Sequence, residues 1–528
     1  MPLLAALAAG AVLRLPTLGR PLLSDDEAIY AATADAMRRG ARLYLDVVDH
    51  KPPLIYFIYQ AGFALTGAFQ TLGAHLFVIL AVLATALALF AIARRGADGD
   101  PTGVVAAAGF LVFSTTWHDY DALAANCELF LLAFQAWAAW LVLWVSDPTR
   151  PGRSGARWAA GHLGIGVLVG LATLCKYQGL TFLGVSLGWL ALDVFRRRVG
   201  PGRGLAAVIL ELSGVAVPVA AFLGWAQIQG SLPATFDWFR FNFLYVGAGL
   251  TGAEAVRRGL TRLALIGAAA LPVYLQGALG AVLTARRWLR RGIAVAGAGN
   301  TGAAVAGPPL VDRLGLLWLV TSVIALCAGG RFFGHYFHLI LAPLALLAST
   351  RLVSLWRRSS LARVLLAVAT LVPALGFFLL ATVLRPQVQA LDEAEPPYDR
   401  VAARIAESSG PEERIFVWGN SPQLYILARR SMGTRFSFCN YMTGESPGTA
   451  TETGGRDADS NVLPVSWTLL FDDLEQRRPA LFIDAAAAGW DGYDKFPLGR
   501  YPRLAAYLAA HYRKIDNVDH VAIYRRSP

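Results

Sequence analysis

The chain has 528 residues, of which 55% are hydrophobic and 16% are charged, and its formal net charge is +11. This composition excludes an ordinary soluble enzyme, in which about a quarter of the residues are charged, and indicates a protein that crosses a membrane several times. The positive charge requires no nucleic-acid partner, because most of the surplus arginine lies in short loops where basic residues meet anionic membrane lipids.

The first predicted elements are membrane spans. The apolar residues gather into segments about as long as a hydrocarbon core is thick, roughly 20 residues each, and we predict about eleven such spans. They cover residues 2–18, 72–93, 102–117, 129–145, 158–175, 179–195, 205–228, 260–283, 314–328, 336–352 and 361–384. The first is interpreted as a retained span, because Arg14 lies inside the apolar run and no signal-peptide cleavage site follows it.

Arginine clusters predict how the spans are oriented. The clusters fall in alternate loops, at residues 94–95, 150–157, 196–203, 286–291 and 351–363. Because basic residues in short loops stay in the cytoplasm, we predict that the remaining loops and the C-terminal tail lie on the extracytoplasmic side. The strong preference for arginine over lysine is typical of a GC-rich bacterial genome, so the expected location is a bacterial plasma (inner) membrane.

The first extracytoplasmic loop, residues 19–70, holds three consecutive acids. Ser24 and Glu27 form a capping box, and Asp25 and Asp26 occupy the first turn of the helix that it begins. Capping needs only the serine and the glutamate, whereas two more adjacent carboxylates repel each other and so raise their pKa values. A general base requires such a raised pKa. Helix capping and catalysis are therefore equal alternatives for these acids.

A lysine followed by two prolines divides the same loop. The prolines end one helix at Lys51 and begin another, whose apolar and aromatic residues are typical of a helix in the membrane interface. Lys51 and Lys176 are two of only four lysines among 47 basic residues, and both fall on the predicted outer face. An ammonium is well suited to bind a phosphate oxygen, which favours a phosphate site. The equal alternative is that each lysine only extends from a helix end toward water.

The composition changes after residue 384, so we divide the chain into a membrane domain, 1–384, and an extracytoplasmic α/β domain, 385–528. We predict helices over 398–408 and 501–512, and strands over 414–420, 479–484 and 520–526. The run at 443–460 is interpreted as a flexible linker, with an acceptor-side element as the alternative. The motif GAGNTG at 297–302 lacks the strand and the acid of a dinucleotide site and is interpreted as a linker.

The motifs resemble the GT-C superfamily of membrane glycosyltransferases. The similarity is greatest to the bacterial branch related to protein O-mannosyltransferases and to the aminoarabinose transferase of lipid A. It rests on the Asp-Glu pair, the Lys-Pro-Pro corner, NCELF with Glu128, GLATLCKYQGL with Lys176, and GRFFGHYFHLILAPLALL with Arg331, His335 and Tyr336. The resemblance implies a polyprenyl-phosphate sugar as donor and transfer on the extracytoplasmic side, with inversion at the anomeric carbon.

Individual roles follow from the same resemblance. Asp26 would be the general base, with Asp25 as an open alternative, and Glu27 would support it or position the acceptor. Lys51 would bind the donor phosphate, and Glu128 would contact the sugar, the acceptor or a divalent ion. The phosphate and lipid site would also include Lys176, Arg331, His335 and Tyr336. The sugar, a hexose or a pentose, and the acceptor, a glycolipid, a wall polysaccharide or a protein, stay open.

No cofactor is firmly implied. His118, Asp119 and Asp121 could join Glu128 in a site for Mg²⁺ or Ca²⁺, with a plain polar loop as the alternative. A transporter or flippase of a lipid-linked saccharide is the main rival function. Such proteins carry ionisable groups near the bilayer midplane and internal repeats, whereas these spans are nearly free of acids. A sensor would need neither the three acids nor the Lys-Pro-Pro corner.

Overall fold

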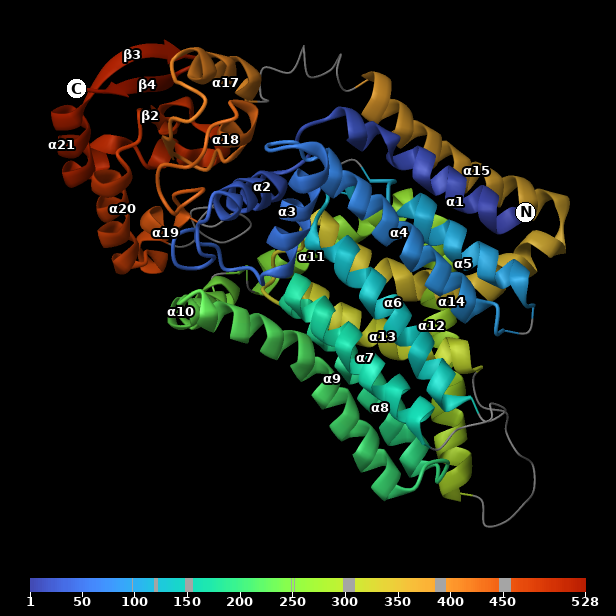
Figure 1. The fold of residues 1–528 in the computed structure, drawn as a ribbon. Coiled ribbons are helices and arrows are strands. Elements are labelled where there is room, and N and C mark those ends of the chain that lie inside the picture. Colours follow the sequence, from blue (N-terminus) through green and yellow to red (C-terminus); the bar gives the residue numbers. More distant parts are fainter. Residues whose placement is uncertain are drawn as a thin grey trace.

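The fold is that of a computed structural model, shown in Figure 1. It describes residues 1–96, 98–117, 122–147, 155–247, 249–250, 252–297, 309–384, 396–445 and 457–528. A bundle of long apolar helices is followed by a small domain with a sheet, drawn in orange and red at one end of the bundle. The predicted fold class is therefore confirmed: a polytopic helical protein with a C-terminal α/β domain.

The bundle is built from these helices: α1 (Pro2–Arg14), α4 (Leu72–Ala93), α5 (Asp100–Phe113), α6 (Cys127–Ser146), α7 (Ala156–Cys175), α8 (Thr181–Phe195), α9 (Pro201–Ile228), α10 (Leu232–Gly247), α11 (Gly252–Ala269), α12 (Leu271–Gly297), α13 (Leu310–Cys327), α14 (His338–Arg358) and α15 (Ser360–Leu379). In the described part of the chain, nine helices are long and apolar enough to cross a membrane, or ten if one bent pair counts as a span.

Of about eleven predicted spans, nine correspond to these nine helices of the described chain, and the two others differ from the prediction. The segment 102–117 forms only the shorter helix α5. The segment 260–283 is bent by 114° between α11 and α12. Pro272 explains the bend, because a proline ring tolerates the first turn of a new helix but cannot continue the preceding one.

We call the end of the bundle that carries residues 176 and 331–337 the site face, and the end that carries residues 196–203 the far face. Helices α7 and α9 connect the two faces and approach each other at glycines. A Cβ atom on Gly166 would lie 2.0 Å from the carbonyl oxygen of Glu211, so only glycine permits this spacing. The close contact fixes the end of α7, from which Lys176 follows.

The first loop folds into two helices, α2 (Asp25–Arg38) and α3 (Leu54–Thr66). Ser24 caps α2 as predicted, because its side chain accepts a hydrogen bond from the backbone N–H of Glu27 at 3.3 Å. Between the helices the chain passes through Tyr44, whose φ of 68° is left-handed, and reaches the Lys-Pro-Pro corner. The loop therefore places the acids of α2 and Lys51 on the same side.

The C-terminal domain contains a four-stranded sheet of order β1-β2-β4-β3. The strands β1 (Ile415–Trp418) and β2 (Leu481–Asp484) are parallel, and β4 (Val521–Arg526) pairs antiparallel with β2 and with β3 (Tyr512–Val518). The helices include α17 (Tyr398–Glu407), α18 (Gln423–Leu427), α19 (Asn440–Thr443), α20 (Pro464–Arg477) and α21 (Pro502–His511). The predicted helices and strands lie where expected, whereas β3, α18, α19 and α20 were not foreseen.

This domain packs on the first loop (Figure 1). The backbone N–H of Val48 donates to the carbonyl oxygen of Arg435 at 3.0 Å, and the hydroxyl of Ser431 donates to Asp35 at 2.6 Å. The contacts close the site face from one side. Three predicted features, the domain boundary at 385, most of the linker at 443–460 and nearly all of the GAGNTG run, lie outside the described residues.

Candidate active site

A cavity of about 850 Å³ lies between the site face and the C-terminal domain. Its walls come from α2, the Lys-Pro-Pro corner, α10, the turns that precede α8 and α14, and the C-terminal domain. The predicted residues that line it are Asp26, Lys51, Lys176, Arg331, His335 and Tyr336, together with Asp25. Segments more than 300 positions apart thus meet in one cavity that holds both carboxylates and cations.

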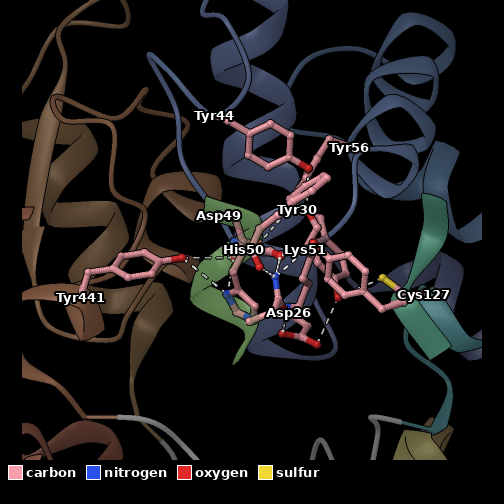
Figure 2. Close-up of polar contacts among 12 residues, drawn as sticks. Asp26, Tyr30, Tyr44, Asp49, His50, Lys51, Tyr56, Cys127 and Tyr441 are labelled. Carbon is pink, nitrogen blue, oxygen red and sulfur yellow. Dashed lines mark hydrogen bonds and ion pairs between the residues drawn. The ribbon is translucent and has the colours of Figure 1, made fainter. Parts of the chain in front are cut away.

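Asp26 and Lys51 form an ion pair at the centre of Figure 2. The ammonium nitrogen lies 2.6 Å from Oδ1 of the aspartate. The hydroxyl of Tyr30, one helical turn further along α2, donates to Oδ2 at 3.2 Å, and the ring of the same tyrosine lies 4.6 Å below the ammonium. The carboxylate therefore has a cation on one oxygen and a hydroxyl on the other.

The pKa of Asp26 shows how strong this pairing is. Burial raises the pKa of the carboxyl, but the ammonium of Lys51, with the more distant His335 and Lys176, outweighs burial and holds it well below its usual range. The expectation that repulsion from Asp25 raises this pKa is wrong. Asp25 instead accepts a hydrogen bond from Gln423 of the C-terminal domain.

Asp49 is a buried carboxylate that sequence reasoning missed. It has no exposed surface and accepts hydrogen bonds from the hydroxyl of Tyr56 at 2.7 Å and from the backbone N–H of His50 at 2.6 Å, while the His50 ring lies 3.0 Å away. Burial raises the pKa of Asp49, but His50 outweighs it and the pKa falls to about 2. The carboxylate thus fixes His50, the residue directly before Lys51.

Four other side chains hold the same corner. The hydroxyl of Tyr44 donates to the carbonyl oxygen of Lys51 at 2.6 Å. Tyr177 and Asn242 donate to the carbonyl oxygen of His50 at 3.1 and 2.6 Å. Tyr441 reaches from the C-terminal domain to within 3.5 Å of Asp49 and His50 (Figure 2). No local motif joins these residues, so the sequence offered no signal for them.

Glu128 and Lys176 form a second ion pair, in which the lysine ammonium donates directly to the carboxylate. His335 lies 3.8 Å from the same carboxylate oxygen, and the Tyr336 ring lies 4.1 Å from the ammonium. Burial lowers the pKa of Lys176, but the nearby Glu128 carboxylate outweighs this and raises the pKa well above its ordinary value. The lysine therefore stays charged within the wall of the cavity.

The two predicted glutamates lie behind the cavity and not in its wall, within the described part of the chain. Glu27 is fully buried and accepts hydrogen bonds from the backbone N–H groups of Leu23 and Ala125 at 2.7 and 2.5 Å, and its other contact is His75 at 3.0 Å. Glu128 holds Lys176. Direct contact of either glutamate with an acceptor or a sugar is thus not favoured by this geometry.

The structure offers no cluster of three or more His, Cys, Asp or Glu side chains suited to a metal ion among the residues that it describes. His118, Asp119 and Asp121, the residues suggested as metal ligands with Glu128, lie outside those residues. A divalent cation accordingly stays a prediction from sequence.

Comparison with known proteins finds a family profile that matches part of the chain and solved structures of similar fold. A profile of the family described as dolichyl-phosphate-mannose-protein mannosyltransferase matches residues 50–225. This segment includes Lys51, Glu128 and Lys176 but neither Asp26 nor Arg331. A search of curated proteins found no match.

Two solved structures show the likeness in fold. ArnT from Cupriavidus metallidurans, bound to undecaprenyl phosphate, is 16% identical with a TM-score of 0.61, over 99% of this chain and 97% of that one. AglB from Archaeoglobus fulgidus, an archaeal oligosaccharyltransferase in complex with an inhibitory peptide and a dolichol-phosphate, is 13% identical with a TM-score of 0.54, over 99% and 74% of the two chains. The chain has the fold of the GT-C glycosyltransferases and resembles protein O-mannosyltransferases and ArnT.

Proposed function

We propose that this protein is a membrane glycosyltransferase that moves a sugar from a polyprenyl-phosphate donor to a hydroxyl of a glycolipid, a wall polysaccharide or a protein on the extracytoplasmic side. The observation that carries the proposal is the cavity of about 850 Å³ in which the carboxylate of Asp26 and several cations line the same space. Sugar transfer from a lipid phosphate needs both: a base for the acceptor hydroxyl and positive charge for the leaving phosphate.

The cations suit the leaving group. Lys176, Arg331 and His335 line the cavity together, so a donor phosphate placed among them would be surrounded by N–H donors. In the reaction the bond between the anomeric carbon and the phosphate oxygen breaks, and the electron pair leaves with the polyprenyl phosphate. Because this leaving group is stable as an anion, the cations can replace a general acid.

Asp26 is the proposed base. The acceptor oxygen attacks the anomeric carbon from the side opposite the phosphate, and its proton passes to the aspartate. A single displacement of this kind inverts the anomeric configuration. Glu27 would act indirectly in this scheme: it anchors the start of α2 through Leu23 and Ala125 and so positions the neighbouring aspartate.

Lys51 couples donor binding to the strength of the base. In the structure its ammonium is paired with Asp26 at 2.6 Å, which makes the aspartate a weak base. A donor phosphate competes for the same ammonium. When Lys51 moves toward the phosphate, Asp26 loses the partner that lowers its pKa most and remains in a buried setting that raises it. The base would thus become strong when the donor is present.

The proposal is tested by presenting the protein in lipid nanodiscs with a panel of polyprenyl-phosphate sugars and a cell-envelope extract as acceptor. The account predicts release of polyprenyl phosphate from one donor class, dependent on the extract. Lys176→Gln and Arg331→Gln should each weaken the donor's apparent affinity, whereas Arg357→Gln, which changes an exposed arginine paired with Asp98, should not. Net movement of an intact donor across the bilayer without release would instead establish a flippase.

A further inference from the structure

A second and smaller cavity lies at the far face of the bundle, between α7, α8 and α9. Its volume is about 50 Å³, several times the roughly 10–15 Å³ that one water molecule requires. The polar and charged side chains that line it include His162, Ser186, Asp193, Arg198, Arg203 and Glu211. None of them has a part in the transfer reaction proposed above, so the burial of His162, Asp193 and Glu211 calls for a separate explanation.

Glu211 is the deepest acid of this group, and 1% of its surface is exposed. His162 lies 2.8 Å from one of its carboxylate oxygens, and the hydroxyl of Ser186 donates to the other at 2.7 Å. Ionisable groups within apolar helices are costly and mark functional sites by default. Both carboxylate oxygens of Glu211 already contact protein groups. A ligand would therefore be bound by other residues of the cavity.

Asp193 is engaged as well. Arg313, itself 1% exposed, donates to this carboxylate at 3.2 Å and lies 3.9 Å above the ring of Trp189. Arg198 approaches the same carboxylate at 3.8 Å and is 46% exposed on its other side. Both carboxylates near the cavity are therefore compensated by groups on neighbouring helices.

Arg203 lines the cavity and has an unpartnered donor within the described part of the chain. Its guanidinium lies 4.8 Å from the centroid of the Trp158 ring, and its Nη2 atom is buried without a hydrogen-bond partner among the residues that the structure describes. A buried N–H group without an acceptor is costly. The guanidinium groups of Arg198 and Arg203 line the cavity, and that of Arg313 pairs with Asp193 beside it. Three guanidinium groups therefore lie in or next to the cavity with two carboxylates, so an anion is the ligand that completes it.

We infer that this cavity binds one phosphate group, with the Nη2 atom of Arg203 as its central donor and the partly exposed guanidinium of Arg198 as a second. A guanidinium offers the planar pair of N–H donors that suits phosphate oxygens. The phosphate could belong to an anionic lipid or be free in solution. Basic pockets between helix ends are a known setting for lipid headgroups.

The surroundings favour the lipid as the source. Directly after Arg203, helix α9 exposes Leu205, Ile209 and Leu212, with exposed fractions of 62%, 55% and 49%. A phospholipid whose phosphate enters the cavity would lay its acyl chains along this apolar strip. The occupancy of this site would then depend on the lipid composition of the leaflet at the far face, independently of the donor cavity at the site face.

The test compares the unaltered protein with Arg203→Gln and with Arg286→Gln, which changes an exposed arginine of α12. Each protein is placed in nanodiscs of phosphatidylcholine with or without phosphatidylglycerol, and native mass spectrometry counts the phosphatidylglycerol that stays bound. We expect one tightly retained molecule, held about fivefold more weakly after Arg203→Gln, since one arginine contributes about 1 kcal/mol to such binding. Arg286→Gln should match the unaltered protein.

A second arm identifies the source of the phosphate. In detergent without phosphatidylglycerol, inorganic phosphate should raise the unfolding temperature of the unaltered protein more than that of Arg203→Gln if the free anion is the ligand. Arg203→Lys, which keeps the charge, serves if the glutamine variant does not fold, and it should retain lipid at an intermediate level. Equal retention of phosphatidylglycerol by all variants, with no effect of inorganic phosphate, would overturn the inference.

Discussion

The ammonium of Lys51 lies 2.6 Å from the carboxylate of Asp26, although the two residues are separated by 25 positions and by a turn of irregular chain. The pair forms because Asp49 and its partners fix the backbone just before Lys51, while the cap at Ser24 fixes the start of α2. The proposed base is thus held inactive by the residue that is expected to bind the donor.

The first prediction concerns the pH dependence of the rate. In the free protein the pKa of Asp26 is lowered, so the carboxylate stays ionised above about pH 4. The profile of kcat/KM for the donor should therefore show no acid limb from this group between about pH 5 and pH 8. If donor phosphate draws Lys51 away, the pKa rises in the complex and kcat should fall at a higher pH than kcat/KM does. Steady-state profiles of both constants measure this. Identical acid limbs in the kcat and kcat/KM profiles would argue against the movement of Lys51 from Asp26 to the donor phosphate.

Asp49 provides the second prediction. Asp49→Asn replaces an acceptor that holds His50 and Tyr56 with an amide that can satisfy them only in part, so the corner that carries Lys51 should shift. We expect kcat/KM for the donor to fall by about 10²-fold, the usual cost of a displacement near 1 Å. Asp46→Asn is the matched control, because Asp46 lies in the same loop but pairs with the exposed Arg42. Equal effects of the two variants would remove Asp49 from the positioning role.

The third prediction separates stability from catalysis at Glu27. Two backbone N–H groups donate to the two different oxygens of Glu27, so Glu27→Gln places its N–H₂ group against one of them and the free energy of unfolding should drop by about 3 kcal/mol. Glu407→Gln, at a position that is 66% exposed, should leave it unchanged. Thermal unfolding in detergent gives the comparison. Per folded molecule, transfer by Glu27→Gln should stay within about tenfold of the unaltered rate, and a deeper loss would indicate direct contact with substrate.

The Glu128 and Lys176 pair gives the fourth prediction. Removing one partner of a buried ion pair leaves an uncompensated charge and costs about 3–5 kcal/mol, so Glu128→Gln and Lys176→Met should each be strongly destabilised. The double variant should recover most of the stability, because no isolated charge remains. It should not recover activity, since Lys176 faces the cavity. Recovery of both properties would show that the pair is purely structural.

Sequence reasoning found the elements that local patterns encode. The cap of α2, the Lys-Pro-Pro corner and the apolar spans each follow from neighbouring residues, and the resemblance to GT-C enzymes indicated which of their side chains meet. Asn242 and Tyr441 could not be found in this way, because their contacts join segments that are far apart in the chain. The strand β3 was missed for a different reason: it is an exposed edge strand, and charges interrupt any apolar alternation.

The bend between α11 and α12 and the ion pair of Asp26 were both missed because a local hydropathy or charge pattern does not determine them. Hydropathy over 260–283 is continuous, and one proline decides that the helix breaks. Likewise, three adjacent acids imply repulsion, but the fold separates Asp25 toward Gln423, Asp26 toward Lys51 and Glu27 toward His75. Tertiary partners, and not sequence neighbours, set the charge state of this site.

The most direct test of the central claim is transfer of a radiolabelled sugar from polyprenyl phosphate to the envelope acceptor by two adjacent variants, Asp26→Asn and Asp25→Asn. Both remove one negative charge from the first turn of α2, but only Asp26 is paired with Lys51. The account predicts a loss of about 10²–10⁴-fold for Asp26→Asn and a small effect for Asp25→Asn, with both proteins folded. Equal transfer by the two variants, or a greater loss for Asp25→Asn, would contradict the assignment of Asp26 as the base.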